Sequence, residues 1–175
     1  MKITTNRTFS SYGTFMFNLC ASVTEYLVKH KWLYYLLAYT WGILMTLLGY
    51  IITLILLFVK LFCKDNIKLN KYYWIYGIKV GPDWWGGFEM GLMFCRDQKS
   101  SDSYVNRHEF GHTFQNCLLG PLFPFLVAIP SALRYWIRNL RTKKGKSNND
   151  YDAIWFECSA TECGKYVVDY LDKNK

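Results

Sequence analysis

The segment YVNRHEFGHTFQNCLL, residues 104–119, contains the pattern H-E-x-x-H between His108 and His112. Residues four positions apart lie on one face of a helix, so the two histidines can bind one metal ion through their imidazole nitrogens. Glu109 then lies where its carboxylate can face a water molecule on that metal. The pattern predicts a zinc ion (Zn2+) held by His108 and His112, with Glu109 as the general base of a hydrolytic reaction.

Other features favour a functional motif over two surface histidines, which is the simpler interpretation of so short a pattern. The chain has three histidines, and two of them stand in this segment. Gly111 is small where the helix has to approach another backbone. A polar loop over residues 96–103 precedes the segment, and Ser101, Asp102 or Ser103 can cap the helix.

A catalytic zinc needs a third protein ligand, which has to come from outside this segment. Glu157 stands in the apolar, helix-like stretch 151–161, where a carboxylate is costly unless it is paired or bound to a metal. We therefore expect Glu157 to be the third ligand rather than part of a solvated helix face. Glu162 and Asp152 are the alternatives. His30 is a poor candidate because it precedes a long apolar segment.

The order of these motifs resembles that of the gluzincin peptidases: H-E-x-x-H, a hydrophobic segment, then E-x-x-A-x. The closest pattern is that of the membrane-embedded group that includes the CAAX-prenyl protease and heat-shock proteases. Their third ligand is the Glu of an E-x-x-A-D motif, and residues 157–161 match its Glu and its Ala. The resemblance implies a membrane zinc peptidase with Glu157 as ligand. In those peptidases the final Asp supports a zinc-bound histidine, and Thr161 stands at that position here. The resemblance therefore implies that Thr161 supports the histidine in a different way, and Asp152 is a second candidate for that role.

The chain also resembles a group of small, functionally uncharacterised bacterial membrane proteins. The similarity is carried by residues 108–116, by Gly120-Pro121-Leu122 and by Ile129-Pro130-Ser131, and it covers roughly residues 39–165. It implies membrane association and no particular substrate.

A long uncharged segment predicts that the protein lies in a membrane. Residues 32–59 carry no charge, and about 20 apolar residues suffice to cross a bilayer. We expect one tilted transmembrane helix within residues 32–63, with aromatic residues gathered at its start as an interfacial belt. A two-helix hairpin is the alternative, which we disfavour because the turn formers inside the segment are Gly42 and Gly49 alone.

The rest of the chain divides around this segment. Residues 1–31 are mixed and predict an arm or a short interfacial helix, and residues 64–175 predict a zincin-like domain. Within that domain, residues 72–80 and 88–94 alternate in polarity on either side of a turn at Gly81-Pro82-Asp83, which predicts a β-hairpin. The expected fold is an α+β membrane protein.

The apolar segment 117–133 is short for a span and contains three prolines. His112 and Glu157 flank it and have to share one metal, so a single crossing there would separate the ligands. We expect a re-entrant or interfacial segment. Basic residues follow both apolar segments, which predicts a cell-membrane protein with its active site on the cytoplasmic side.

Composition limits the partners. The formal net charge of +8 comes without a nucleic-acid-binding signature, so we expect membrane lipids rather than nucleic acid to attract it. The six cysteines form no C-x-x-C pair and are expected to be reduced thiols.

Three functions compete. We favour a membrane-anchored zinc metallopeptidase over an inactive membrane scaffold that retains the metal site. A site-2-type intramembrane protease is disfavoured because the motif helix starts with polar residues and no N-P-D-G motif is present.

Substrate recognition is expected at a strand just upstream of the motif helix. A peptide or protein substrate can add a strand to an exposed sheet edge, and Phe88 to Phe94 is the best edge candidate. Phe88, Glu89 and Met90 would then be substrate-strand residues, with Glu89 facing outward. Tyr151 and Arg107 are the candidate donors to the oxyanion.

Overall fold

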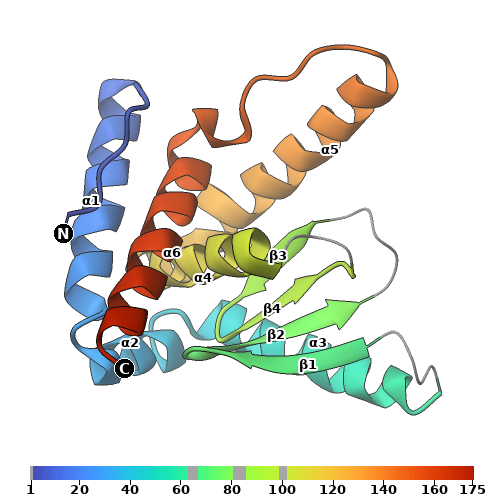
Figure 1. Cartoon of the computed structure of the whole chain (residues 1–175). Coiled ribbons are helices and arrows are strands. Elements are labelled where there is room, and N and C mark those ends of the chain that lie inside the picture. The colour runs from blue at the N-terminus through green and yellow to red at the C-terminus, as the bar shows by residue number, and fades with distance from the viewer. Residues whose placement is uncertain (1, 63–66, 81–85, 99–101) are drawn as a thin grey trace.

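The computed structural model describes residues 2–62, 67–80, 86–98 and 102–175, which form an α+β fold of six α-helices and one four-stranded sheet (Figure 1). The predicted α+β class is confirmed. The predicted turn at Gly81-Pro82-Asp83 and the cap candidate Ser101 lie outside the described residues. The helices are α1 (Ser11–Leu27), α2 (Lys31–Tyr39), α3 (Ile43–Lys60), α4 (Asp102–Leu119), α5 (Ile129–Lys143) and α6 (Trp155–Lys173).

The sheet differs from the predicted hairpin. Its strands are β1 (Ile67–Tyr72), β2 (Ile75–Val80), β3 (Gly87–Met90) and β4 (Met93–Arg96). Their order is β1-β2-β4-β3: β1–β2 and β3–β4 are antiparallel hairpins, whereas β2 and β4 pair in parallel. The prediction that residues 72–80 and 88–94 pair as one hairpin is therefore wrong. Each stretch already contains its own turn, at Tyr73 and at Gly91, where φ is +48° and +70°.

The sheet is packed between α4 and α3, because successive side chains on a strand point to opposite faces. On β4, Phe94 belongs to the same buried cluster as Phe110 of α4. Its neighbours Met93 and Cys95 belong to a second cluster, against which Ile52 of α3 packs. α4 is therefore held on one face of the sheet and α3 on the other.

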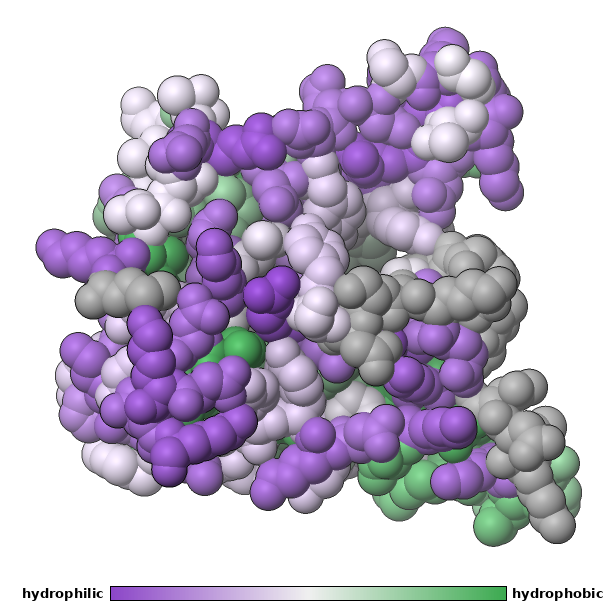
Figure 2. Space-filling view, viewed as in Figure 1, coloured by the Kyte–Doolittle hydropathy of each residue, from purple (hydrophilic) through white to green (hydrophobic). Residues whose placement is uncertain are grey.

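The long uncharged segment forms two helices, not the single helix that the sequence predicted. The chain bends between Tyr39 and Ile43, where the Gly42 N–H donates to the Leu37 carbonyl. After the bend, the hydroxyls of Tyr39 and Tyr50 hydrogen bond at 2.7 Å, which ties α2 to α3. Among the described residues, α3 is the one helix long and apolar enough by itself to cross a membrane. Hydrophobic residues emerge below the sheet in Figure 2, where Figure 1 places α3.

The apolar segment 117–133 is not straight. α4 ends at Leu119 and is followed by a 3-10 turn at Gly120–Leu122, a π-helical turn at Pro124–Ala128 and then α5. The helical stretches before and after Phe123 are bent by 116° relative to each other. Proline removes a backbone donor and clashes with the preceding turn, which accounts for a bend at this point.

The contact between α4 and α6 depends on small residues. A Cβ added at Gly111 of α4 would lie 1.9 Å from the Ala160 carbonyl oxygen of α6. A Cβ added at Gly164 of α6 would lie 1.8 Å from the Arg107 carbonyl oxygen. The two backbones thus touch at both points, which is the close approach that the sequence analysis expected of Gly111.

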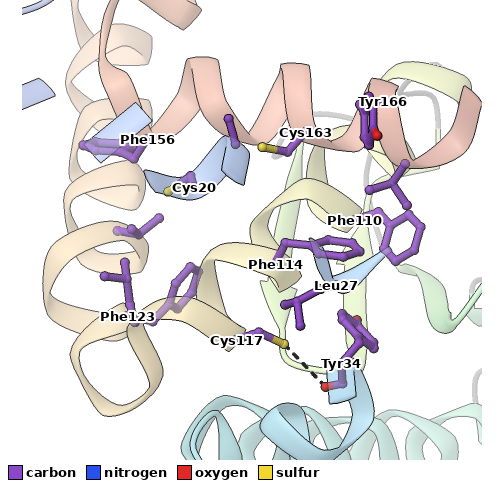
Figure 3. Packing of buried hydrophobic residues seen from close by; sticks show 14 of the residues in the cluster. Cys20, Leu27, Tyr34, Phe110, Phe114, Cys117, Phe123, Phe156, Cys163 and Tyr166 are labelled. Carbon is purple, nitrogen blue, oxygen red and sulfur yellow. Dashed lines mark hydrogen bonds between the residues drawn. The ribbon is translucent and has the colours of Figure 1, made fainter. Parts of the chain in front are cut away.

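Buried aromatic and sulfur-containing side chains surround this contact. Figure 3 shows Phe110, Phe114 and Cys117 of α4 between residues of α6, such as Cys163, and Tyr34 of α2. The Cys117 thiol lies 3.7 Å from the Tyr34 carbonyl oxygen. The five cysteines that the structure describes are free and buried, in agreement with the reduced thiols that the sequence predicted.

We predict that Gly111→Ala destabilises the protein. The added methyl group forces α4 and α6 apart, at a cost of about 2–3 kcal/mol that exceeds the roughly 1 kcal/mol gained in helix propensity. Thermal unfolding followed by circular dichroism measures the change. Lys165→Ala, at an exposed position beside Gly164, is the matched control and should stay within about 0.5 kcal/mol of the wild type. A Gly111→Ala variant as stable as this control would contradict the packing argument.

Candidate metal centre

His108 and His112 on α4 and Glu157 on α6 lie together where the two helices touch. The His108 Nε2 is 3.1 Å from the His112 Nε2 and 3.1 Å from the Glu157 Oε2, and the His112 Nε2 is 3.6 Å from the same oxygen. In a tetrahedral zinc site with bonds of about 2.0–2.1 Å, neighbouring ligand atoms are about 3.3 Å apart. The three atoms therefore have the spacing that a single small metal ion requires.

The other ring nitrogen of His112 fixes its tautomer. Gln115 donates through its Nε2 to the Phe156 carbonyl oxygen at 2.7 Å and to the Ser159 hydroxyl at 2.6 Å. Its Oε1 therefore faces the His112 Nδ1, at 2.7 Å, and accepts a hydrogen bond from the N–H there. With Nδ1 hydrogen-bonded to Gln115, Nε2 is the nitrogen of His112 that faces the cluster.

His108 is oriented in the same way by a relay of two side chains. The Thr161 hydroxyl donates to the Asp152 Oδ1 at 3.1 Å. The oxygen of the same hydroxyl lies 2.9 Å from the His108 Nδ1 and accepts a hydrogen bond from its N–H. Thr161 and Asp152 thus form one hydrogen-bonded relay behind His108. Outer partners of this kind orient an imidazole and raise its basicity toward a metal.

Glu157 brings a negative charge into a fully buried position. Its side chain is 0% exposed, and its Oε1 has no hydrogen-bond partner among the described residues. Burial alone would raise the pKa of Glu157, but hydrogen bonds from His108 and His112 outweigh it and hold that pKa below its usual value. Burial alone would lower the pKa of His112, because it disfavours the charged imidazolium. The hydrogen bond to Glu157 and the charge of that carboxylate outweigh burial and raise this pKa to about 9. The cluster therefore attracts positive charge, which fits a divalent cation better than a neutral ligand set would.

Glu109 lies beside the cluster but is not part of it. A cavity of about 30 Å³, room for a water molecule, is lined by Glu109, His112 and Tyr151. A Cβ added at Gly87 of β3 would lie 2.3 Å from the Glu109 Oε1, so glycine there lets the carboxylate lie against the strand. Burial raises the pKa of Glu109, while His112 and His108 oppose the rise. Such a carboxylate binds a proton more readily than an exposed one.

The two candidate oxyanion donors have different places. Tyr151 lines the cavity, its ring centroid lies 5.6 Å from that of His108, and the Arg134 guanidinium donates to its carbonyl oxygen at 3.3 Å. Arg107 instead donates back along α4 to the Ser103 carbonyl oxygen at 2.9 Å. Tyr151 is therefore positioned at the site, and Arg107 is not.

The alternative ligands lie outside the cluster. Glu162 lines a separate surface pocket with Arg7 and Cys158, and Asp152 reaches the site through Thr161. His30 stacks on Tyr26, near the end of α1.

The strand expected to bind substrate differs in detail from the prediction. β3 ends at Met90, and Phe94 belongs to the inner strand β4, so the exposed edge does not extend to Phe94. Glu89 does not face outward: it is 4% exposed and lines the small cavity, and burial raises its pKa to about 8. Its Oε1 accepts from the Gly91 N–H at 2.6 Å, an inward orientation that alternation alone did not predict.

A larger groove adjoins the small cavity. It has a volume of about 680 Å³ and is lined by residues of β3, α4 and α5 and by Ile52 of α3. His108, Glu109 and Tyr151 belong to its lining. Most of its lining is apolar, including Ile52 and Trp136.

Comparisons with known proteins give no relative. No protein-family model matches the chain, and no curated protein or solved structure is significantly similar to it. The site's geometry and chemistry therefore carry the functional argument.

We predict that Glu157→Gln loses bound zinc while Glu162→Gln retains it. The amide is isosteric but uncharged, and Glu162 lies outside the cluster. Zinc content of the purified variants, measured by mass spectrometry, separates the two. Retention of one zinc per chain by Glu157→Gln would remove this residue from the ligand set.

We also predict that Thr161→Val weakens zinc affinity about 10- to 100-fold without unfolding the protein, because His108 loses the acceptor that orients it. Competition with a chromogenic chelator measures the affinity. Asp152→Asn should weaken zinc binding in the same direction, since the carboxylate acts through Thr161. An unchanged affinity in both variants would mean that the relay has no role in metal binding.

Proposed function

We propose that this protein is a membrane-associated, zinc-dependent peptidase whose active site faces the cytoplasm. The observation that carries the proposal is the convergence of His108, His112 and Glu157 at metal-ligand spacing beside the buried carboxylate of Glu109. A structural metal site would have closed coordination. Here three protein ligands leave one position, and the water-sized cavity lies against His112.

Glu109 is the proposed general base. When bound, a zinc ion would supply the positive charge that lowers the pKa of a water molecule beside it. The Glu109 carboxylate accepts a proton from that water, whose oxygen attacks the peptide carbonyl carbon. Glu109 then returns the proton to the nitrogen of the leaving amine as the C–N bond breaks, so no external acid is needed.

Tyr151 is the proposed donor to the carbonyl oxygen, which becomes negatively charged in the transition state. Tyr151 lines the small cavity, and burial, followed by the charge of Glu157, raises the pKa of its phenol. It therefore stays protonated at neutral pH and can donate a hydrogen bond.

The substrate is proposed to bind in the groove between β3 and α5. Gly87, Phe88 and Met90 of β3 line it, and a peptide extended there could pair with the backbone of Gly87 and Phe88. Met90 is covered from the other side, since a Cβ added at Gly49 of α3 would lie 2.2 Å from its carbonyl oxygen. The apolar lining favours large apolar side chains next to the cleaved bond.

We predict that Glu109→Gln retains zinc and loses peptide cleavage by at least about 1000-fold. The side chain is not a ligand, so removing its charge leaves the three ligand atoms in place. Zinc content and cleavage of a fluorogenic peptide library by the same preparation are the two measurements.

Glu162→Gln is the control for this variant and should cleave like the wild type. Loss of zinc from Glu109→Gln would make Glu109 a ligand instead of a base. A wild-type protein that holds zinc but cleaves nothing would favour the metal-binding scaffold over the peptidase.

A further inference from the structure

Segments on both sides of α3 in the sequence belong to one packed body. α1 precedes α3, yet it packs against α6 and α4, which follow it (Figure 1). The Arg7 Nη1 and the Asp150 Oδ2 are 2.7 Å apart, and the Thr5 hydroxyl lies 3.2 Å from the Cys158 thiol. A lone crossing by α3 would place these partners on opposite sides of a bilayer, where they could not touch.

The sheet also prevents lipid from surrounding α3. α3 is pressed against the end of β3, where an added Cβ at Gly49 would meet the Met90 carbonyl oxygen, and it also contacts β1. β1 is an edge strand that exposes Lys68, Asn70 and Lys71. Open sheet edges and exposed lysines are not tolerated in the hydrocarbon core. Only the outer side of α3 can therefore meet lipid.

That outer side is part of a larger apolar surface. α3 contacts the turn at Gly120–Leu122, which continues through residues 124–128 into α5, and Ile52 of α3 and Trp136 of α5 line the same groove. We therefore infer that the exposed apolar residues of these elements form one surface. Soluble monomers rarely expose more than a few hundred Å² of continuous apolar area. Figure 2 shows a mostly hydrophilic face on another side of the molecule, over α1 and α6. The members of the apolar surface are Leu44, Leu47, Leu48, Ile51, Leu54, Ile55, Phe58, Val59, Leu122, Phe125, Leu126, Ile129, Leu133, Trp136, Ile137 and Leu140.

α5 shows how charge is arranged around this surface. Its arginines are turned toward the protein: Arg134 donates to the Asp150 carbonyl oxygen and Arg141 to that of Ser147. Trp136 and Leu140, in contrast, are 65% and 58% exposed. Exposed basic residues follow at the end of the helix, namely Lys143, Lys144 and Lys146. An apolar face with basic residues at its margin fits a membrane surface with anionic headgroups.

We propose that the protein is monotopic: its apolar surface is embedded in one leaflet of an anionic phospholipid bilayer, and α3 lies along the leaflet without crossing it. This arrangement replaces the transmembrane helix expected within residues 32–63. It holds whether or not the protein is a peptidase. The groove that leads to Glu109 then opens beside lipid, because Trp136 belongs both to its lining and to the apolar surface.

The sidedness of two single-cysteine reporters tests the proposal. Asn18→Cys on α1 and Lys173→Cys on α6 are exposed positions before and after α3, and each is placed in a Cys63→Ser background whose other five cysteines are buried. A membrane-impermeant maleimide is applied to sealed membranes of each orientation. We expect both reporters to react from the same side, and labelling from opposite sides would establish a crossing and overturn the proposal.

Vesicle binding tests the surface itself. The double variant Leu133→Lys/Trp136→Lys should lower the ratio of bound to free protein by at least about tenfold in flotation with vesicles of anionic and zwitterionic phospholipid. Tyr12→Lys/Phe15→Lys on α1, whose side chains are 56% and 62% exposed, is the matched control and should bind like the wild type. Circular dichroism verifies that both variants are folded. Equal binding by the two double variants, or a loss confined to the α1 variant, would refute the assignment of the surface.

Discussion

α4 and α6 touch backbone to backbone, and this close approach sets where the residues of the candidate metal centre lie. Gly111 meets Ala160, and Gly164 meets the backbone at Arg107, so no side chain separates the two helices at their crossing. Because the two helices are this close, the Glu157 carboxylate on α6 reaches the ring nitrogens of His108 and His112 on α4. A larger residue at either glycine would move the third ligand away from the first two. The candidate metal centre is thus a consequence of helix packing as much as of the motif.

Local spacing explains what the sequence could predict. The i, i+4 histidines need only a helix, and a carboxylate in an apolar stretch needs a buried partner, so the three residues of the cluster follow from chemistry that acts over a few positions. The α+β class follows from the same kind of pattern. The sequence named Thr161 and Asp152 as candidate supports of a histidine, but spacing did not show that they act in series. Asp152 stands nine residues earlier, outside α6, and comes behind Thr161 only because the chain turns at Tyr151–Ala153.

Pairing between distant segments explains what the sequence could not predict. β1 shows little alternation between polar and apolar residues, because its exposed residues include lysines and an asparagine. Its partner β2 follows a turn at Tyr73, and tyrosine rarely adopts a positive φ, so the residue type does not predict this turn. At the bend, the Gly42 carbonyl oxygen accepts a hydrogen bond from the side chain of Asn116, which is 74 residues away in the sequence. Glu89 turns inward because its carboxylate accepts from the Gly91 N–H in the same hairpin. Each of these features depends on a contact that the pattern of polar and apolar residues along the sequence does not reveal.

The placement of the ligands also has a topological consequence for the chain as a polymer. His112 and Glu157 are 45 positions apart (157 minus 112), and α5 with its flanking turns lies between them in the sequence. An ion held by both would close this stretch into a loop, and a cross-link of that length removes more freedom from the unfolded chain than from the folded one. α1 packs on α6, so the N-terminal helix also depends on the position of the helix that carries Glu157. Binding of such an ion and the docking of α6 would therefore be coupled equilibria, each strengthening the other.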